Sequence, residues 1–404
     1  MTYKYICYYV PYLMEGLNSK AHGEGTGMNR ALLAATLAIS LLAACGDGGG
    51  PRQQAEATPD PGPDTVRIEV VDTLGVMMGD SAYVFGNITD ATMTADGRLL
   101  VLDGLKSRIG IFDESLEPLG FVGRSGSGPG EYQYPRSFAL LDDGGLVVCD
   151  WAGRSITYLD GEMEVDTIIS DFVRIAPDRI VPCPGGNYVG MSLEHGVEDG
   201  QPVGENFIAR FGRSTEPEVV YCAYPMRFSA DEDGDLNVHT TGLAWDTGPD
   251  GSVWVAVVSD STWEFTGCTL EGDTIRTISR EWDRVEKTQE ELEEGLLHET
   301  LSTGSESGSS VNRERRYDIV GRYHEAITSL DVDGQGRIWI GQGWTDIPVF
   351  DVYSPGGELL FVATIPGMEN QDGLSFCFDH GMIGFDTQPD DYPKVYLLRL
   401  EESL

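Results

Sequence analysis

The sequence predicts an all-β protein, a six-bladed β-propeller with a helical insertion after the fourth blade. The first observation is a short pattern that occurs six times, a glycine-containing turn followed by a run of apolar and β-branched residues. Asp-Gly and Gly-Gly pairs supply the positive φ angles of tight hairpin turns. Val, Ile, Leu, Trp and Tyr fit a half-buried strand. The equivalent glycines are Gly97, Gly144, Gly185, Gly251, Gly336 and Gly381.

The second observation is the spacing of these glycines, which are 47, 41, 66, 85 and 45 residues apart. Three of the spacings match one repeat of about 40–50 residues. Further strands surround each turn. In the first repeat Ala91-Thr92-Met93 precedes it, Arg108–Phe112 follows the second strand, and Pro118–Val122 comes last. Four antiparallel strands per repeat are typical of a propeller blade.

The two long spacings predict insertions rather than missing blades. The larger one lies at about 281–325, where Glu286–His298 has a helical composition, with its leucines on one face, and a Ser/Gly-rich loop follows. Six blades is the favoured count. Seven remain an alternative if the region Ala223–Thr240 contains a degenerate unit.

The linker between the first two repeats carries a family resemblance. Gly123–Pro135 has the sequence GRSGSGPGEYQYP, and an Asp-Gly turn and Val148-Cys149-Asp150 follow it. This stretch resembles the linker and blade of NHL-repeat proteins, and the chain is similar to six-bladed propellers of the NHL/TolB-like group. The third and fourth repeats lack the Gly-Pro-Gly-Glu linker. The resemblance implies the fold, but the family includes binding platforms as well as metal-dependent lyases and lactonases, so it does not choose an activity.

The N-terminal region predicts a bacterial lipoprotein. Met28-Asn29-Arg30 begins a signal peptide, and the apolar run Ala31–Leu42 is too short to span a bilayer. Leu42-Ala43-Ala44-Cys45 matches a lipobox, so Cys45 is expected to be lipidated and to become the mature N-terminus. An ordinary cleaved signal with an incidental cysteine is the alternative. Gly46 after the cysteine favours delivery to the outer membrane.

These features predict the domain organisation. Residues 1–27 are interpreted as an upstream mis-start, 28–44 as the signal peptide, 45–64 as a flexible tether and 65–404 as the propeller. The expected location is the bacterial cell envelope, with membrane contact through the lipid anchor only.

The net charge and the cysteine content restrict the kinds of partner and the covalent links that the chain is expected to have. A formal net charge of −39 argues against nucleic-acid binding, which requires a basic footprint. Of seven cysteines, five follow Cys45. They show no CxxC spacing, and a Cys183–Cys222 disulfide is one open possibility.

Candidate ligand-binding residues lie where the sequence departs from the repeat. Arg136 and Arg174 begin innermost strands near the channel opening, where they are candidates for holding an anionic ligand. Trp151 and Trp344 follow second strands in loops and are candidates for an exposed contact.

No catalytic residue is assigned, and no cofactor is expected apart from a weak Ca²⁺ candidate. Asp231, Asp233 and Asp235 alternate in an acidic loop, but glycine falls at the fourth rather than the sixth place. An exposed acidic loop is the favoured interpretation. No histidine has a metal-ligand spacing, although ligands from several blades can converge at a propeller channel.

The leading functional hypothesis is a non-catalytic envelope lipoprotein that presents a propeller face to a protein, peptide or glycan partner. The insertion is its expected contact element. The alternatives are a metal-dependent lyase or lactonase at the channel mouth and a purely architectural envelope protein. The sequence does not identify the ligand, the biological process or the oligomeric state.

Overall fold

The computed structural model describes residues 64–401, except 171, 173–175, 199–200, 231–235, 240–241, 294, 296–320, 370–372, 388 and 390. The predicted signal peptide, Cys45 and the tether lie outside the described residues, as do Arg174, Asp231, Asp233 and Asp235. None of the helices in the described part is long and apolar enough to cross a membrane.

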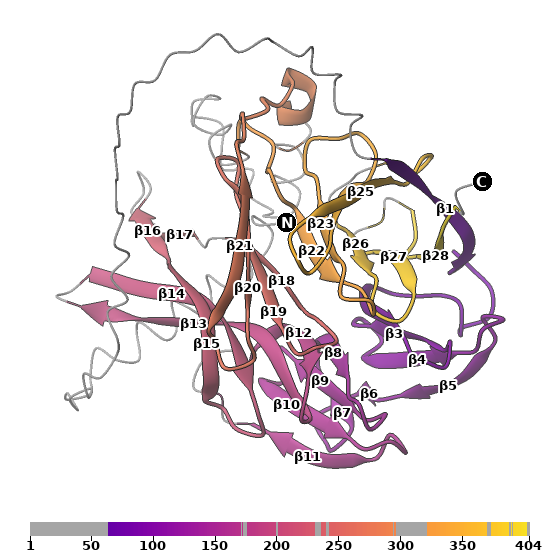
Figure 1. Cartoon of the computed structure of the whole chain (residues 1–404). Helices are drawn as coiled ribbons and strands as arrows, with labels where there is room; N and C mark the ends of the chain where they lie inside the picture. Colours follow the sequence, from indigo (N-terminus) through magenta and orange to yellow (C-terminus); the bar gives the residue numbers. More distant parts are fainter. Residues whose placement is uncertain are drawn as a thin grey trace, which may run out of the picture.

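Six antiparallel blades surround a central channel, as predicted (Figure 1). The first three are regular four-stranded sheets. From the innermost strand outward, blade 1 contains β2 (Ile88–Met93), β3 (Leu99–Asp103), β4 (Arg108–Phe112) and β5 (Pro118–Val122). Blade 2 contains β8 (Pro135–Leu140), β9 (Leu146–Asp150), β10 (Ser155–Leu159) and β11 (Val165–Ile169). Blade 3 contains β12 (Asp178–Cys183), β13 (Asn187–Glu198), β14 (Gln201–Phe211) and β15 (Pro217–Pro225).

The remaining blades follow the same order. Blade 4 contains β18 (Gly242–Thr247), β19 (Val253–Val258), β20 (Trp263–Cys268) and β21 (Thr274–Arg280). Blade 5 contains β22 (Ser329–Val332), β23 (Ile338–Gly341), β24 (Val349–Tyr353) and β25 (Leu359–Thr364). Blade 6 contains β26 (Leu374–Cys377), β27 (Met382–Asp386), β28 (Val395–Leu400) and, outermost, the N-terminal strand β1 (Thr65–Leu74).

The N-terminal strand closes the ring, a feature that the repeat pattern did not predict. From Ile68 to Leu74, β1 pairs antiparallel with β28, and its first residues pair parallel with β25 of blade 5. Figure 1 shows β1 between these two strands. Because β1 belongs to the last blade, the two ends of the propeller chain are held in one sheet.

The long spacing between the third and fourth turns is explained by added hairpin structure. The hairpin β13–β14 is longer than those of blades 1 and 2 and projects from the ring, and β16 (Arg227–Ala230) pairs with β17 (Leu236–His239) beside it (Figure 1). The region Ala223–Thr240 therefore holds the end of β15 and a two-stranded hairpin in its described part. It is not a four-stranded blade, so the seven-blade alternative is wrong.

The predicted helical insertion is described only at its beginning and end. Residues 289–293 form about one helical turn, and the capping box between Thr288 and Glu291 starts it: the Thr288 amide donates to Glu291 Oε2 (2.6 Å). Residues 296–320 lie outside the described residues. The longer helix therefore stays a prediction.

The hydrophobic core consists of six clusters, each between neighbouring blades. Leu102 and Val148 lie in the cluster of blades 1 and 2, and Leu74 and Ile383 lie in the cluster that joins blade 6 to blade 1. The other four clusters fill the remaining interfaces. Burial between blades rather than within one blade means that the blades depend on one another for stability.

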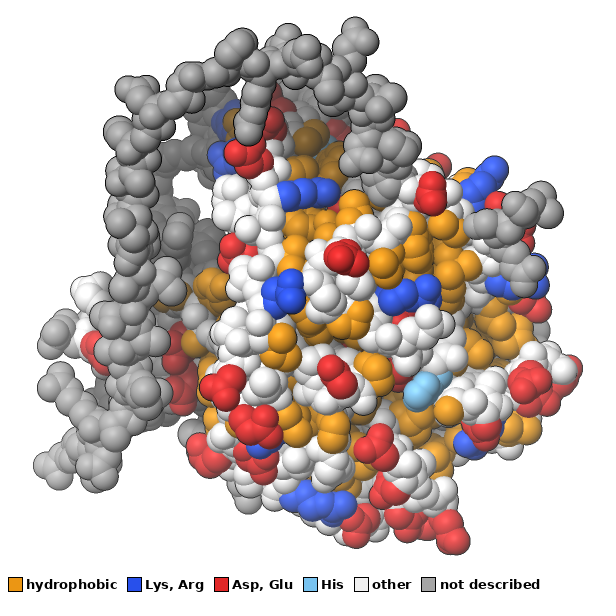
Figure 2. All heavy atoms as spheres, viewed as in Figure 1, with side chains coloured by type: hydrophobic (Ala, Val, Ile, Leu, Met, Phe, Trp, Pro, Cys, Tyr) orange, Lys and Arg blue, Asp and Glu red, His pale blue; other side chains and the backbone are white. Residues whose placement is uncertain are grey.

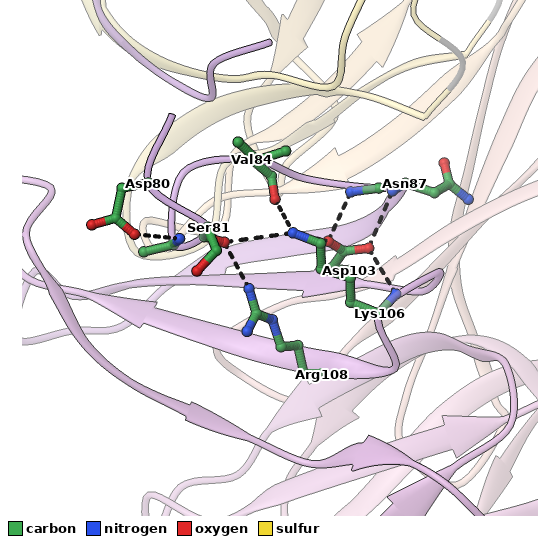
Figure 3. A network of polar contacts seen from close by, with 9 residues as sticks. Asp80, Ser81, Val84, Asn87, Asp103, Lys106 and Arg108 are labelled. Atoms are coloured by element: carbon green, nitrogen blue, oxygen red, sulfur yellow. Dashed lines mark hydrogen bonds and ion pairs between the residues drawn. The ribbon is translucent and has the colours of Figure 1, made fainter. Parts of the chain in front are cut away.

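Buried aspartates tie the inter-blade loops to blades 1 and 2. Asp103 at the end of β3 accepts hydrogen bonds from the amides of Gly86 (2.8 Å), Asn87 (3.1 Å) and Lys106 (3.1 Å), as Figure 3 shows in part. Asp150 at the end of β9 accepts from Gln133 and Tyr134 (both 2.8 Å). In both blades the carboxylate receives amides 17 and 16 residues earlier, so it fixes the loop through which the chain enters the blade.

The Gly-rich linker between blades 1 and 2 is organised by its glutamate. Glu131 Oε2 accepts hydrogen bonds from the amides of Ser127 (3.1 Å) and Gly128 (2.9 Å), and its other oxygen pairs with Arg124 (2.7 Å). The short strands β6 (Arg124–Ser125) and β7 (Glu131–Tyr132) pair in parallel around it. These amides therefore bind an internal carboxylate, the kind of acceptor that a phosphate would supply in a phosphate-binding loop.

Candidate functional site

Strand direction places the candidate residues on one face of the propeller. Innermost strands begin, and second strands end, on the same face, which we call the loop face. The glycine turns lie on the opposite face, which we call the turn face. Arg136 at the start of β8, Trp151 after β9 and Trp344 after β23 all belong to the loop face. The structure thus brings three of the four predicted ligand-binding residues to one face, while Arg174 lies outside the described residues.

Arg136 does not point freely into the channel opening. Its Nη1 lies 3.5 Å from Asp178 Oδ2 of blade 3, and both side chains are largely buried. A buried pair of opposite charges is largely self-compensated, so Arg136 offers an anion less attraction than the sequence suggested. Its role in ligand binding stays a prediction.

Trp151 is partly buried in the turn that follows β9. Its amide donates to the Tyr134 carbonyl (3.2 Å), next to the two amides that Asp150 holds. The same hydrogen-bonded loop therefore supports the tryptophan. This is a rigid position for a partly exposed aromatic ring.

Trp344 is part of a larger aromatic group, which we call the aromatic ledge: Trp282, Trp344 and Arg280. The two indole rings lie 4.4 Å apart at 50°. The Arg280 guanidinium lies 4.1 Å from the ring centroid of the buried Trp263 and 5.8 Å from that of Trp344. Since Trp282 and Trp344 are both partly exposed, the ledge offers an aromatic surface beside a cation.

The ledge joins blade 5 to the start of the insertion. Trp282 follows β21, and its Nε1 donates to the Asp260 carbonyl (3.0 Å) in the loop after β19. Asp260 also pairs with Arg284, whose guanidinium lies 4.4 Å from the Tyr323 ring centroid. Sequence reasoning missed Trp282 and Arg280. The available signal was a tryptophan within the charged stretch Glu281–Arg284, where no strand requires it.

A histidine fastens the other end of the insertion to the same loop. His324 Nδ1 lies 3.0 Å from the Gly343 carbonyl, and its Nε2 lies 3.2 Å from Glu291 Oε1 in the helical turn. A carbonyl oxygen only accepts, so Nδ1 carries a proton. His324 thereby links the helical turn to the loop that holds Trp344.

The channel contains buried carboxyl groups from several blades. Asp90 of blade 1 accepts hydrogen bonds from the Ser137 hydroxyl (2.8 Å) and the Phe138 amide (2.9 Å) of blade 2. Asp246 of blade 4 accepts from the Val332 amide of blade 5 (2.7 Å). These side chains therefore connect the innermost strands of neighbouring blades.

Burial dominates the electrostatics of the channel. It raises the pKa of Asp90 to about 6, against the opposing effect of its hydrogen bonds. It raises the pKa of Asp331 in β22 to about 7, with a smaller lowering by Arg179, and Asp331 Oδ2 has no hydrogen-bond partner. Burial and the neighbouring Asp331 also raise the pKa of Asp246. Burial thus favours the protonated form of each of these carboxyls more strongly than water does.

Arg179 is the cation nearest to these carboxyls. It occupies a bulge of β12 with a φ of 46°, a left-handed conformation that is costly for a residue with a side chain. Its guanidinium lies 5.0 Å from the Trp245 ring centroid. The bulge thus directs an arginine toward a channel whose other charged groups are acidic.

The structure tests the possible disulfide but not the Ca²⁺ candidate. Among the residues that the structure describes, no three His, Cys, Asp or Glu side chains form a group that would hold a metal ion. The predicted Ca²⁺ residues lie outside that part. Cys149, Cys183, Cys222, Cys268 and Cys377 are all free thiols, so the possible Cys183–Cys222 disulfide is absent.

Comparisons with known proteins agree on the fold. A family model, DUF5128, described as a 6-bladed beta-propeller, matches residues 81–209. No curated relative matches the chain.

Solved structures of low sequence identity also match the chain. Virginiamycin B lyase from Staphylococcus aureus is 10% identical, with a TM-score of 0.43 over 83% of this chain and 100% of the other. An exported protein from Bacteroides fragilis is 12% identical, with a TM-score of 0.44 over 84% and 99%. Likeness at this level says nothing about activity.

Proposed function

Because the chain is a six-bladed β-propeller, we propose that it is a non-catalytic binding lipoprotein of the cell envelope, which presents its loop face to a protein, peptide or glycan partner. The observation that carries the proposal is the aromatic ledge. Partly exposed tryptophans beside an arginine, here one that also pairs with Asp351 (3.0 Å), are typical of binding hot spots.

The surroundings of the ledge support this location. Near the ledge, Asp260 accepts a hydrogen bond from Trp282 and pairs with Arg284. On the face of the molecule that Figure 2 shows, acidic side chains are scattered between hydrophobic ones. The ledge adds two indole rings, which have a large contact area and few rotatable bonds, so a partner would immobilise little that is not already ordered. The insertion begins and ends beside these rings, and it is the extra contact element of the proposal.

Site-specific photocrosslinking tests the proposed face. A photoreactive phenylalanine analogue is placed at Trp344 in living cells, and the matched control carries it at Leu119, an exposed residue of the outer strand β5. The proposal expects one discrete envelope partner captured at Trp344 and not at Leu119, with capture reduced by Trp282→Ala. Equal patterns at the two sites would exclude the loop face as the binding surface.

The lipid anchor requires a separate test. Cys45→Ser is expected to abolish incorporation of labelled palmitate and to release the protein from the membrane fraction, because the thiol is the predicted acceptor of the lipid. Cys7→Ser is the control and is expected to change neither. Unaltered labelling of the Cys45→Ser protein would contradict the predicted anchor.

A further inference from the structure

A cavity on the turn face lies between blades 5 and 6, away from the aromatic ledge. Its volume is about 170 Å³. A cavity of roughly 150 Å³ is large enough to admit benzene. The cavity lies between the β22–β23 turn and the β26–β27 turn, which the Gly334 amide joins by donating to the Asp379 carbonyl (2.9 Å). The residues that carry its chemistry are Asp333, Arg337, Trp339, Phe378, Asp379 and His380.

Blade 5 contributes the guanidinium of Arg337, which Asp333 holds in place and which has two further nitrogens able to donate hydrogen bonds. Arg337 Nε donates to Asp333 Oδ2 (2.6 Å), and the same oxygen accepts from Trp339 Nε1 (2.9 Å). Asp333 Oδ1 accepts from the Gln335 and Arg337 amides (both 2.9 Å). In the part of the chain that the structure describes, Nη1 and Nη2 of Arg337 donate to no residue. Two parallel donors on a fixed guanidinium match the two oxygens of a carboxylate.

Blade 6 contributes a carboxyl group. The Asp379 side chain is about 39% exposed, and its Oδ2 lies 3.5 Å from Nε2 of the neighbouring His380, too far for a strong hydrogen bond. Partial burial and Asp333 raise the pKa of Asp379, while His380 lowers it. A cationic group of a ligand beside the Asp379 carboxylate would offset the cost of partly removing this carboxylate from water. Between the two charged groups, the lining is mainly apolar, with Trp339 and Phe378 packed 4.5 Å apart.

We propose that this cavity binds a free α-amino acid with a small apolar side chain, such as valine. Arg337 Nη1 and Nη2 bind the α-carboxylate, Asp379 binds the α-ammonium group, and the side chain lies against the apolar lining. The Arg337 charge is already paired with Asp333, so its remaining N–H donors rather than its net charge bind the carboxylate. The Asp379 carboxylate favours a zwitterion over a simple anion. The two blade turns thus form one site only in the closed ring.

Calorimetric titration of the mature protein with L-valine tests the proposal. Valinamide lacks the carboxylate and N-acetylvaline lacks the ammonium group, so each is expected to bind at least about tenfold more weakly than valine. Asp379→Asn is expected to weaken valine binding by about tenfold and to remove the preference for valine over N-acetylvaline. Equal binding of the three compounds, or no binding of valine, would overturn the proposal.

Two arginine variants distinguish recognition from folding. Arg337→Lys keeps the charge but loses the paired donors, so weaker binding of valine is expected. Arg98→Lys is the matched control, because Arg98 follows Gly97 as Arg337 follows Gly336, and it pairs with Asp96 on the surface of blade 1. If Arg337→Lys lowers the melting temperature, weaker binding could result from a folding defect. In that case the valine binding of Asp379→Asn is the result that tests the site. Equal effects of the two lysine variants on valine binding would contradict the site.

Discussion

Blades 1 and 2 fix their entry loops with a buried aspartate, whereas blades 4 and 5 have no aspartate at the equivalent position. Asp103 and Asp150 lie six residues after the turn glycine, where blade 4 has Val257 and blade 5 has Gln342. Gln342 donates to Asp351 of its own blade (2.8 Å). The loops of blades 4 and 5 carry the aromatic ledge and the insertion. Loss of the repeated carboxylate thus accompanies the surface that we assign to binding.

The channel shows the same contrast between the two halves of the ring. Asp90 of blade 1 accepts hydrogen bonds from the Ser137 hydroxyl and from the amides of Phe138 and Ala91. Asp331 of blade 5 is more deeply buried than Asp90, and its Oδ2 has no hydrogen-bond partner among the residues that the structure describes. A buried oxygen without a hydrogen-bond donor lowers the free energy of unfolding. Asp90 does not carry this cost, because its oxygens accept hydrogen bonds. Among the described residues, Asp90 is therefore more completely hydrogen-bonded than Asp331.

The largest effect on stability is expected from a substitution that removes a buried aspartate of blades 1 and 2. Asp150→Ala removes the buried carboxylate that accepts hydrogen bonds from the Gln133 and Tyr134 amides, so it is expected to lower the free energy of unfolding by about 4 kcal/mol. Urea denaturation measures the change. Asp160→Ala is the matched control, because Asp160 also accepts two amides in blade 2 but is exposed, and about 1 kcal/mol is expected. Similar losses in both variants would contradict a special role for the buried carboxylate.

The second prediction concerns the dependence of stability on pH. The pKa of Asp331 is about 7 in the folded protein and 3.8 without the fold, so the folded state binds the proton more tightly. Below about pH 4 Asp331 is protonated in both the folded and the unfolded state, and its effect on the free energy of unfolding does not depend on pH. As the pH rises from about 4 through 7, the buried group resists ionisation and the free energy of unfolding falls. Asp331→Asn cannot ionise, so it is expected to raise the free energy of unfolding at pH 8 by about 3 kcal/mol, and less at pH 4.

Asp90→Asn is the counterpart in the regular half. The amide nitrogen cannot accept the hydrogen bonds that the carboxylate oxygen receives, so this variant is expected to lose stability at both pH values. Urea denaturation of both variants at pH 4 and pH 8 measures the difference. A gain in Asp90→Asn as large as that in Asp331→Asn would show that the hydrogen bonds around Asp90 do not distinguish the two sites.

The same division explains which features the sequence predicted. The turn glycines of blades 1 to 5 have positive φ angles, 83° at Gly97 and Gly144, which glycine adopts at little cost, so the pattern marks these blades. Gly381 of blade 6 does not have the positive φ that the pattern predicted. The place of β1 in blade 6 was missed, because pairing of Ile68 with Leu400 depends on residues distant in sequence. Local patterns predict hairpins, and ring closure is not local.

The sequence likewise predicted site residues that local patterns mark and missed those that depend on contacts between distant residues. Trp344 was predicted as an exposed contact from its loop, but its neighbour Trp282 was not, because the two meet only after blades 4 and 5 pack together. The Arg337–Asp379 cavity likewise combines turns of two blades. The sequence carried no signal for this cavity, because its two turns are distant along the chain.

The smallest expected effect lies in the ledge itself. Trp282→Ala and Trp344→Ala each remove a partly exposed ring, so a modest loss of stability is expected, and the double variant is expected to lose less than the sum of the two. The coupling of the tilted rings is expected to be about 1 kcal/mol, the value typical of an aromatic pair beyond its buried area. Trp151→Ala combined with Trp282→Ala is the control pair, with no coupling expected, because Trp151 lies in blade 2. If the Trp282–Trp344 pair also shows none, the rings do not form one surface, and the contrast between the two halves would then rest on the aspartates alone.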